Sequence, residues 1–167
     1  MARVPRLEPT FEPADALIGI ATNIPVIQLV HFINSKSFLK LVRKDDFPVY
    51  SEKTNTQIES KFFHGEDQDF RSTFSLFCNN NEGVNLLPSH KQFGYFLVVY
   101  GAITDEKIKQ LISQIKSIPG VQLAAVIKQE SIKLLEGILL DLELHLSAIK
   151  TEKTKKQKNF MDLSENQ

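Results

Sequence analysis

The sequence predicts an α+β fold, a two-layer sandwich whose mostly antiparallel sheet has about five strands, with helices on one side and a C-terminal helix. Three observations predict it. Short apolar runs are bounded by turn residues, two longer segments repeat apolar residues at helical spacing, and the order is strand, helix, three strands, helix, strand. Such an order pairs neighbouring strands through hairpins and leaves the helices to cover a face of the sheet.

The first strand is expected at residues 16–21, an apolar run that leads into Thr22-Asn23. A helix then begins near Pro25, because a proline at the first helical position lacks only an N–H that would have no partner there. Its buried face repeats at helical spacing and consists of Val26, Leu29, Val30 and Ile33. We expect this helix to end near Ser37.

Three strands are expected at residues 57–64, 70–78 and 95–101. The first two alternate apolar and polar residues, as antiparallel strands covered on one side do, and HGEDQD between them reads as a hairpin turn. The third, YFLVVYG, has apolar residues at both odd and even positions and therefore on both faces, which predicts a position in the middle of the sheet.

The second helix is expected to follow Thr104, whose side chain can cap it, and to end at Ile118-Pro119-Gly120. Residues 121–127 make the last strand, because Val121, Leu123, Ala125 and Ile127 fall on one face.

A C-terminal helix is expected at residues 131–149, because its apolar residues are spaced alternately by three and four. These seam residues are Ile132, Leu135, Leu139, Leu142, Leu146 and Ile149. A coiled coil uses the same spacing but over more heptads, so the pattern favours packing on the chain's own domain over a homodimer. The predicted organisation is an N-terminal arm at 1–13, one domain at 14–149 and a disordered, lysine-rich tail at 150–167.

Composition excludes several classes of protein. The 20 basic and 20 acidic residues balance, so nucleic acid is not expected as a partner, although five lysines at 150–158 leave RNA contact by the tail open. Cys78 is the only cysteine, and no stretch resembles a signal peptide or a membrane span. We therefore expect a cytoplasmic protein without membrane association.

No motif for phosphate loops, dinucleotides or zinc is present in the sequence, so no cofactor, no metal and no catalytic residue is predicted. The histidines lie in four separate predicted segments without ligand spacing, at positions His31, His64, His90 and His145. Cys78 ends a strand on its core face, which is typical of a buried structural thiol.

Residues 87–95, LPSHKQFGY, resemble the motif that names the IPExxxVDY proteins, an uncharacterised bacterial family of about this length. Pro88 and Tyr95 match the motif, whereas Ser89 and Gly94 replace its Glu and Asp. The segments ALIGIATN, FIN, LVRKDD, YFLVVYG and IKSIPGVQ extend the resemblance over residues 11–140.

The family has no assigned activity, so the resemblance implies a shape and no mechanism. Because both motif carboxylates are missing, we interpret this segment as an entry turn into the strand at 95–101. In that interpretation the Ser89 side chain can form a hydrogen bond with a backbone group, and Gly94 can adopt a positive φ.

These observations favour a non-enzymatic protein-interaction module that holds an unknown protein partner or a second copy through its C-terminal helix or an exposed sheet face. The alternative is an enzyme or small-molecule binder with a site near Asn34, Arg43, Asp46 and Tyr95, where Arg43 could hold a carboxylate or phosphate. RNA binding by the tail is a further alternative.

Overall fold

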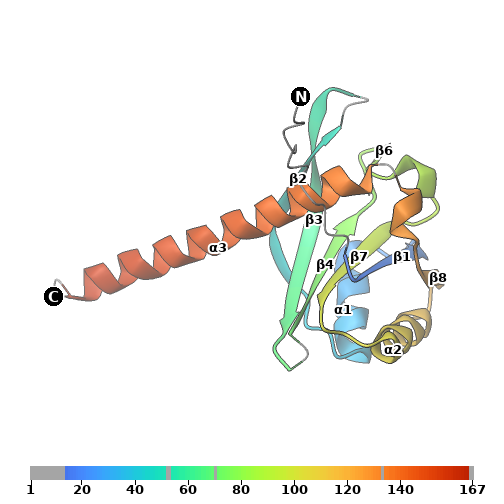
Figure 1. Cartoon of the computed structure of the whole chain (residues 1–167), viewed down its shortest axis with the longest axis horizontal. Helices are drawn as coiled ribbons and strands as arrows, with labels where there is room; N and C mark the ends of the chain where they lie inside the picture. The colour runs from blue at the N-terminus through green and yellow to red at the C-terminus, as the bar shows by residue number, and fades with distance from the viewer. Residues whose placement is uncertain (1–13, 52–53, 70, 133, 166–167) are drawn as a thin grey trace, which may run out of the picture.

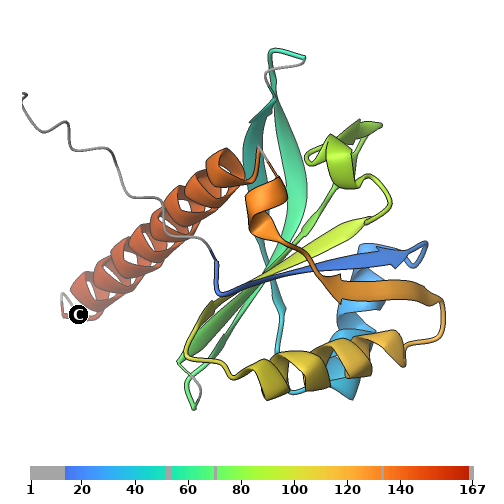
Figure 2. The same cartoon turned by 45° about the vertical axis from the view of Figure 1, so that its right-hand side comes forward.

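A computed structural model describes residues 14–51, 54–69, 71–132 and 134–165, and it has the predicted α+β class (Figure 1). One antiparallel sheet has the strand order β2-β3-β4-β7-β1-β8. Helices cover both of its faces (Figure 2). The elements are β1 (Ala16–Thr22), α1 (Val26–Lys36), β2 (Val42–Ser51), β3 (Thr56–Asp67), β4 (Ser72–Cys78), β5 (Asn80–Asn81), β6 (Val84–Asn85), η1 (Pro88–His90), β7 (Tyr95–Gly101), α2 (Asp105–Lys116), β8 (Val121–Val126), η2 (Gln129–Ser131) and α3 (Leu135–Glu165).

The strand β7 lies in the middle of the sheet, as its unbroken apolar run predicts. It pairs with β4 on one side and with β1 on the other, so that Val99 lies between Phe74 and Ala16. Residues of both parities are buried, including Phe96, Leu97 and Val98. A strand in this position needs apolar side chains on both faces because each face lies against a core.

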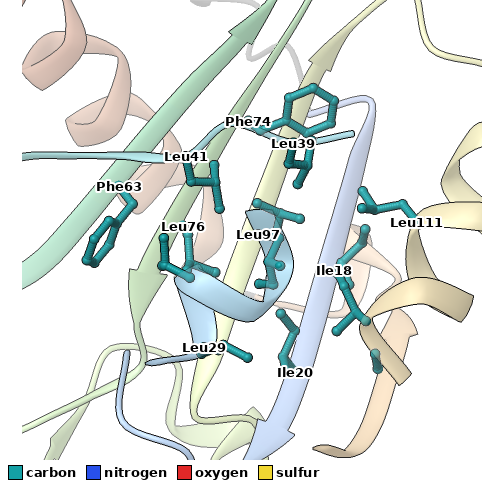
Figure 3. Packing of buried hydrophobic residues seen from close by; sticks show 14 of the residues in the cluster. Ile18, Ile20, Leu29, Leu39, Leu41, Phe63, Phe74, Leu76, Leu97 and Leu111 are labelled. Atoms are coloured by element: carbon teal, nitrogen blue, oxygen red, sulfur yellow. The ribbon is translucent and has the colours of Figure 1, made fainter. Parts of the chain in front are cut away.

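The first core lies between one face of the sheet and the helices α1 and α2 (Figure 3). Both helices bury the stripes expected from their spacing, and the Thr104 hydroxyl caps α2 by accepting a hydrogen bond from the Lys107 N–H at 3.2 Å. Residues of both helices and of five strands meet in this core, among them Ile18, Leu29, Phe74, Leu97 and Leu111.

The second core lies on the opposite face and is closed by the first half of α3. The molecule therefore has one layer more than the predicted two-layer sandwich, because the C-terminal helix packs on the other side of the sheet. The strands β3 and β4 are also buried on both faces, where one-sided burial was expected. Phe62 and Phe77 pack beneath α3, while their neighbours Phe63 and Leu76 pack against the helices of the first core.

The strand β2 was not predicted, and it makes six strands in the main sheet where about five were expected. It is an edge strand in which only Phe47 and Val49 are buried, so its apolar pattern is too weak to identify it. Pro48 lies within it, and prolines in strands are tolerated at edges because one side of an edge strand needs no N–H donors.

The helix α3 begins at Leu135 and runs for 31 residues to Glu165, beyond the expected end at 149. Residues 150–165, expected to be a disordered tail, form its second half, which projects from the domain (Figure 1). The physical reason is that lysine, glutamate and glutamine are good helix formers, so a helix anchored by a core can continue into a polar segment. The predicted arm at 1–13 lies outside the described residues.

The segment between β4 and β7, which contains the LPSHKQFGY motif, is organised by the buried side chain of Asn79. Its amide nitrogen donates to the carbonyl oxygens of Phe93 at 2.9 Å and His90 at 3.2 Å, and its oxygen accepts from the Leu87 N–H at 2.8 Å. The segment therefore packs as a turn before β7, and Ser89 bonds only to the neighbouring His90 ring among the contacts described.

Gly94 does not have the positive φ that we considered for it. Gly101 at the end of β7 is a constrained glycine, because its φ is 118° and an added Cβ would lie 2.2 Å from the Arg71 carbonyl oxygen. The close approach of two backbones, which the sequence pattern does not show, makes glycine necessary at this position.

Leu139→Ala should destabilise the protein by about 2–5 kcal/mol, the usual cost of truncating a buried leucine. Leu139 is 2% exposed in the second core, whereas its neighbour Leu140 is 55% exposed. Leu140→Ala is therefore the matched control and should change the free energy of unfolding little. Denaturant unfolding of both variants checks this, and equal losses would contradict the described orientation of α3.

Asn79→Ala should cost about 2–3 kcal/mol, because it leaves buried backbone groups of the segment before β7 without partners. Ser89→Ala, which removes an exposed hydroxyl of the same segment, should be nearly neutral. Thermal unfolding of the two variants provides the comparison. A neutral Asn79→Ala would show that water replaces the side chain without loss.

Candidate functional site

Asn34, one of the four predicted binding residues, has its side chain engaged by the backbone. Its Nδ2 donates to the Leu41 carbonyl oxygen at 2.9 Å, and its Oδ1 accepts from the Leu41 N–H at 2.8 Å. The amide thus closes the connection between α1 and β2. A side chain with both ends used in this way stabilises a loop and offers a ligand little.

Tyr95, the second predicted residue, holds the start of β7 to the start of α1. Its hydroxyl donates to the Ile24 carbonyl oxygen at 2.8 Å. The ring is half-buried, and burial raises the pKa of Tyr95 to about 12, so the phenol remains a hydrogen-bond donor at neutral pH.

Arg43 and Asp46 are the two predicted residues that the structure brings together. They form an ion pair within β2, and the Arg43 guanidinium also lies 5.4 Å from the centre of the Phe63 ring. Both side chains are partly exposed, so the pair by itself contributes little stability. The four predicted residues therefore do not form one site, but two of them line the groove described next.

An open groove of about 570 Å³ lies between β2 and the part of α3 that leaves the sheet. The strand contributes consecutive charged residues, and the helix contributes residues spaced by three and four. The lining residues are Arg43, Lys44, Asp45, Asp46, Ile149, Glu152, Lys153 and Lys156. Sequence reasoning missed Lys153 and Lys156, because they were assigned to a tail without structure.

His145 fixes the helix against the strand that forms the other wall. Its Nε2–H donates to the Asp45 carbonyl oxygen at 2.9 Å, and its ring centre lies 5.3 Å from that of Phe62 and 5.7 Å from that of Phe47. The histidine thus has a packing role, and it sets the distance between the two walls of the groove.

Lys44 of β2 and Lys153 of α3 line the groove from its two walls. Burial lowers the pKa of Lys44, and the charge of the adjacent Lys153 lowers it further, while the carboxylate of Glu66 acts in the opposite direction. Like charges disfavour each other's ionised state, so this arrangement costs free energy in the absence of a counterion.

His64 lies buried on β3 on the same face as Phe62. Its Nδ1 is hydrogen-bonded to the Ser75 hydroxyl at 2.9 Å, and its Nε2 is 3.7 Å from Glu66 Oε1. Burial lowers the pKa of His64; Glu66 opposes this, and Lys44 and Lys150 add to it. The ring is therefore neutral at pH 7.

The predicted interaction seam is covered by the chain's own sheet. Its first four members are buried in the second core, and Leu146 and Ile149 are partly buried against the same core. The large apolar side chains that α3 leaves exposed lie elsewhere, on its outer face and at its far end; they are Leu140, Leu144, Phe160, Met161 and Leu163.

Groups that could carry out chemistry are sparse in the part of the chain that the structure describes. No three histidine, cysteine or carboxylate side chains there lie close enough to hold a metal ion. Cys78 is buried, and burial raises the pKa of its thiol, which makes it a poor nucleophile at neutral pH.

Comparisons with models of known families, with curated proteins and with solved structures found no match to this chain. Among the described helices, none is both long enough and apolar enough to cross a membrane.

The stability of the protein should fall as the pH drops from about 7.5 to about 5.5, in part because of His64. The folded state lowers the pKa of this ring, so the unfolded chain binds the proton more readily. The contribution is present above the unfolded pKa of about 6.5 and is lost as the pH falls below it.

His64→Asn should remove this part of the pH dependence, whereas His31→Asn, on the exposed side of α1, should leave the dependence as in the wild type. Chemical denaturation at several pH values measures both. Parallel curves for wild type and His64→Asn would contradict the assignment.

Proposed function

We propose that the protein is a cytoplasmic, non-enzymatic interaction module that holds a protein partner with the second half of α3. The observation that carries the proposal is the exposure of three large apolar side chains near the end of that helix. Phe160 is 77% exposed, Met161 67% and Leu163 71%. They lie on an element that extends away from its own domain (Figure 2).

The position of these residues on the helix supports the proposal. The alternate spacing of three and four continues past Ile149 through Lys153 and Lys156 to Phe160 and Leu163. One helix face is thus apolar where the sheet covers it, cationic beside the groove, and apolar again where its own domain no longer reaches. An apolar surface that resumes beyond the domain is typical of a contact with another molecule.

The length of the helix supports it as well. The 31 residues of α3 span about 47 Å, of which the second half accounts for about 24 Å. The side chains at 150–164 are exposed, so a partner that covers the apolar end would add the tertiary packing from which helices in proteins draw most of their stability.

Charge defines the kind of partner. Lysines at five positions between 150 and 158 surround the helix, against one carboxylate, Glu152, in the same stretch. A protein with an apolar groove edged by carboxylates would accept such a helix, since amphipathic helices commonly bind in grooves and opposite charges favour the encounter. The near absence of reactive groupings among the described residues is in keeping with a binding role.

We also propose that the chain is a divergent member of the IPExxxVDY family. The support is the ordered set of similar segments over residues 11–140. The packing of LPSHKQFGY as a turn around Asn79 is consistent with a structural role for that motif, because Ser89 bonds to the neighbouring His90 ring and the Gly94 backbone bonds to Ile20 and Asn79.

The double substitution Phe160→Ala/Leu163→Ala should abolish partner binding and leave the melting temperature unchanged, because these side chains contribute nothing to either core. The control Gln157→Ala/Asn159→Ala changes two exposed residues on the same half of α3 and also raises helix propensity. A partner protein is first captured with the full-length chain, identified and purified separately. The measurement is a titration of the full-length chain with this purified protein.

Support requires saturable binding to the wild type, a loss of about tenfold or more with Phe160→Ala/Leu163→Ala, and near-wild-type affinity for the control. Equal affinity for all three proteins contradicts the proposal. Sedimentation velocity at two concentrations tests the alternative that the end of α3 binds a second copy of this chain. Self-association that depends on Phe160 and Leu163 would show a homodimer in place of the proposed partner protein.

A further inference from the structure

The groove between β2 and α3 places four cationic side chains of two elements around one volume. Arg43 and Lys44 come from the edge strand, and Lys153 and Lys156 come from the helix. The two helical lysines are three residues apart and lie on the seam face, so both point toward the strand when the seam packs on the sheet. His145 holds the two walls together through its bond to Asp45.

The cationic side chains of the groove outnumber its carboxylates, four against three. Asp46 is engaged by Arg43, whereas Lys44 and Lys153 line the groove from its two walls, and the charge of Lys153 lowers the pKa of Lys44. Lys150 adds a further positive charge near His64, on the same side of the sheet. Two ammonium groups that repel each other from the two walls of one groove form a place where an anion relieves repulsion.

We propose that this groove binds the phosphate group of a small phosphorylated metabolite, with Lys44 and Lys153 as its principal contacts. Lys156 and Arg43 flank them, and Arg43 can add a two-bonded contact to phosphate oxygens if its pair with Asp46 opens. The volume of about 570 Å³ lies within the range of small-molecule sites.

A small ligand fits this groove better than a nucleic acid. Asp45 and Glu152 also line it, and their charges would repel the backbone of a long polyanion on either side of the bound phosphate. The chain as a whole has 20 basic and 20 acidic residues, so it lacks the extended field that non-specific nucleic-acid binding requires. The site shares Lys153 and Lys156 with the lysine-rich stretch of the proposed protein contact, but it does not involve Phe160 or Leu163.

The test compares the wild type with Lys44→Met/Lys153→Met and with the control Lys155→Met/Lys158→Met. The control removes the same charge from the opposite face of the same helix half, where both lysines are exposed. Isothermal titration with inorganic phosphate, pyrophosphate and AMP measures affinity, and a single-stranded RNA oligonucleotide is titrated in parallel. Melting temperatures verify that both variants fold.

Saturable binding of at least one of the three small phosphates is expected, weakened about tenfold or more by Lys44→Met/Lys153→Met and little changed in the control. In spectra of labelled lysine side chains, the Lys44 and Lys153 signals should shift on binding. Tighter binding by AMP than by inorganic phosphate would show that the rest of the metabolite also contacts the groove. Equal weakening in the two variants, no binding at millimolar concentrations, or tight RNA binding without measurable binding of the small phosphates would each overturn the proposal.

Discussion

The packing of α3 on the second face of the sheet is the interaction on which the other features of this molecule depend. The sheet has an apolar face toward α1 and α2 and another, rich in phenylalanine, that those helices cannot reach. The first half of α3 covers this second face with the seam from Leu135 to Ile149. The direction of the helix, the position of the groove beside β2 and the projection of residues 150–165 all follow from that contact.

Along α3, the character of one helix face changes with distance from the core. Near Leu139 the face is buried and stabilises the fold. Near Lys153 it borders the groove, where charge dominates because water reaches the side chains. At Phe160 it is apolar again and has left the domain. Because the helix is continuous, a ligand in the groove and a partner at the end would both bear on the same rigid element, which allows one to influence the affinity for the other.

Much of the fold could be predicted because local patterns and tertiary environment agree. The stripe from Val26 to Ile33 and the run of apolar residues on both faces of β7 indicate burial directly. The cap at Thr104 indicates where α2 begins. The strand β2 was missed because an exposed edge buries only Phe47 and Val49 of its ten residues. Of the eight residues that line the groove, Arg43 and Asp46 were chosen from the sequence as binding residues, whereas Lys153 and Lys156 belong to a polar segment whose helical state depends on the packing of α3 on the sheet. The roles of Asn34 and Tyr95 depend on backbone partners that no spacing in the sequence identifies.

The order of elements along the chain has a consequence for biosynthesis. The strands that carry Phe47, Phe62, Phe77 and Phe96 are made before the helix that covers them, and the bond between His145 and Asp45 joins residues 100 positions apart. During synthesis the sheet can therefore form while its second face is still open to solvent. An exposed face of this kind is a point at which partly folded chains associate. The last stretch of the domain to be translated thus shields the nascent protein from aggregation, and a ribosome that stalls before residue 132 would release a sheet with one uncovered side.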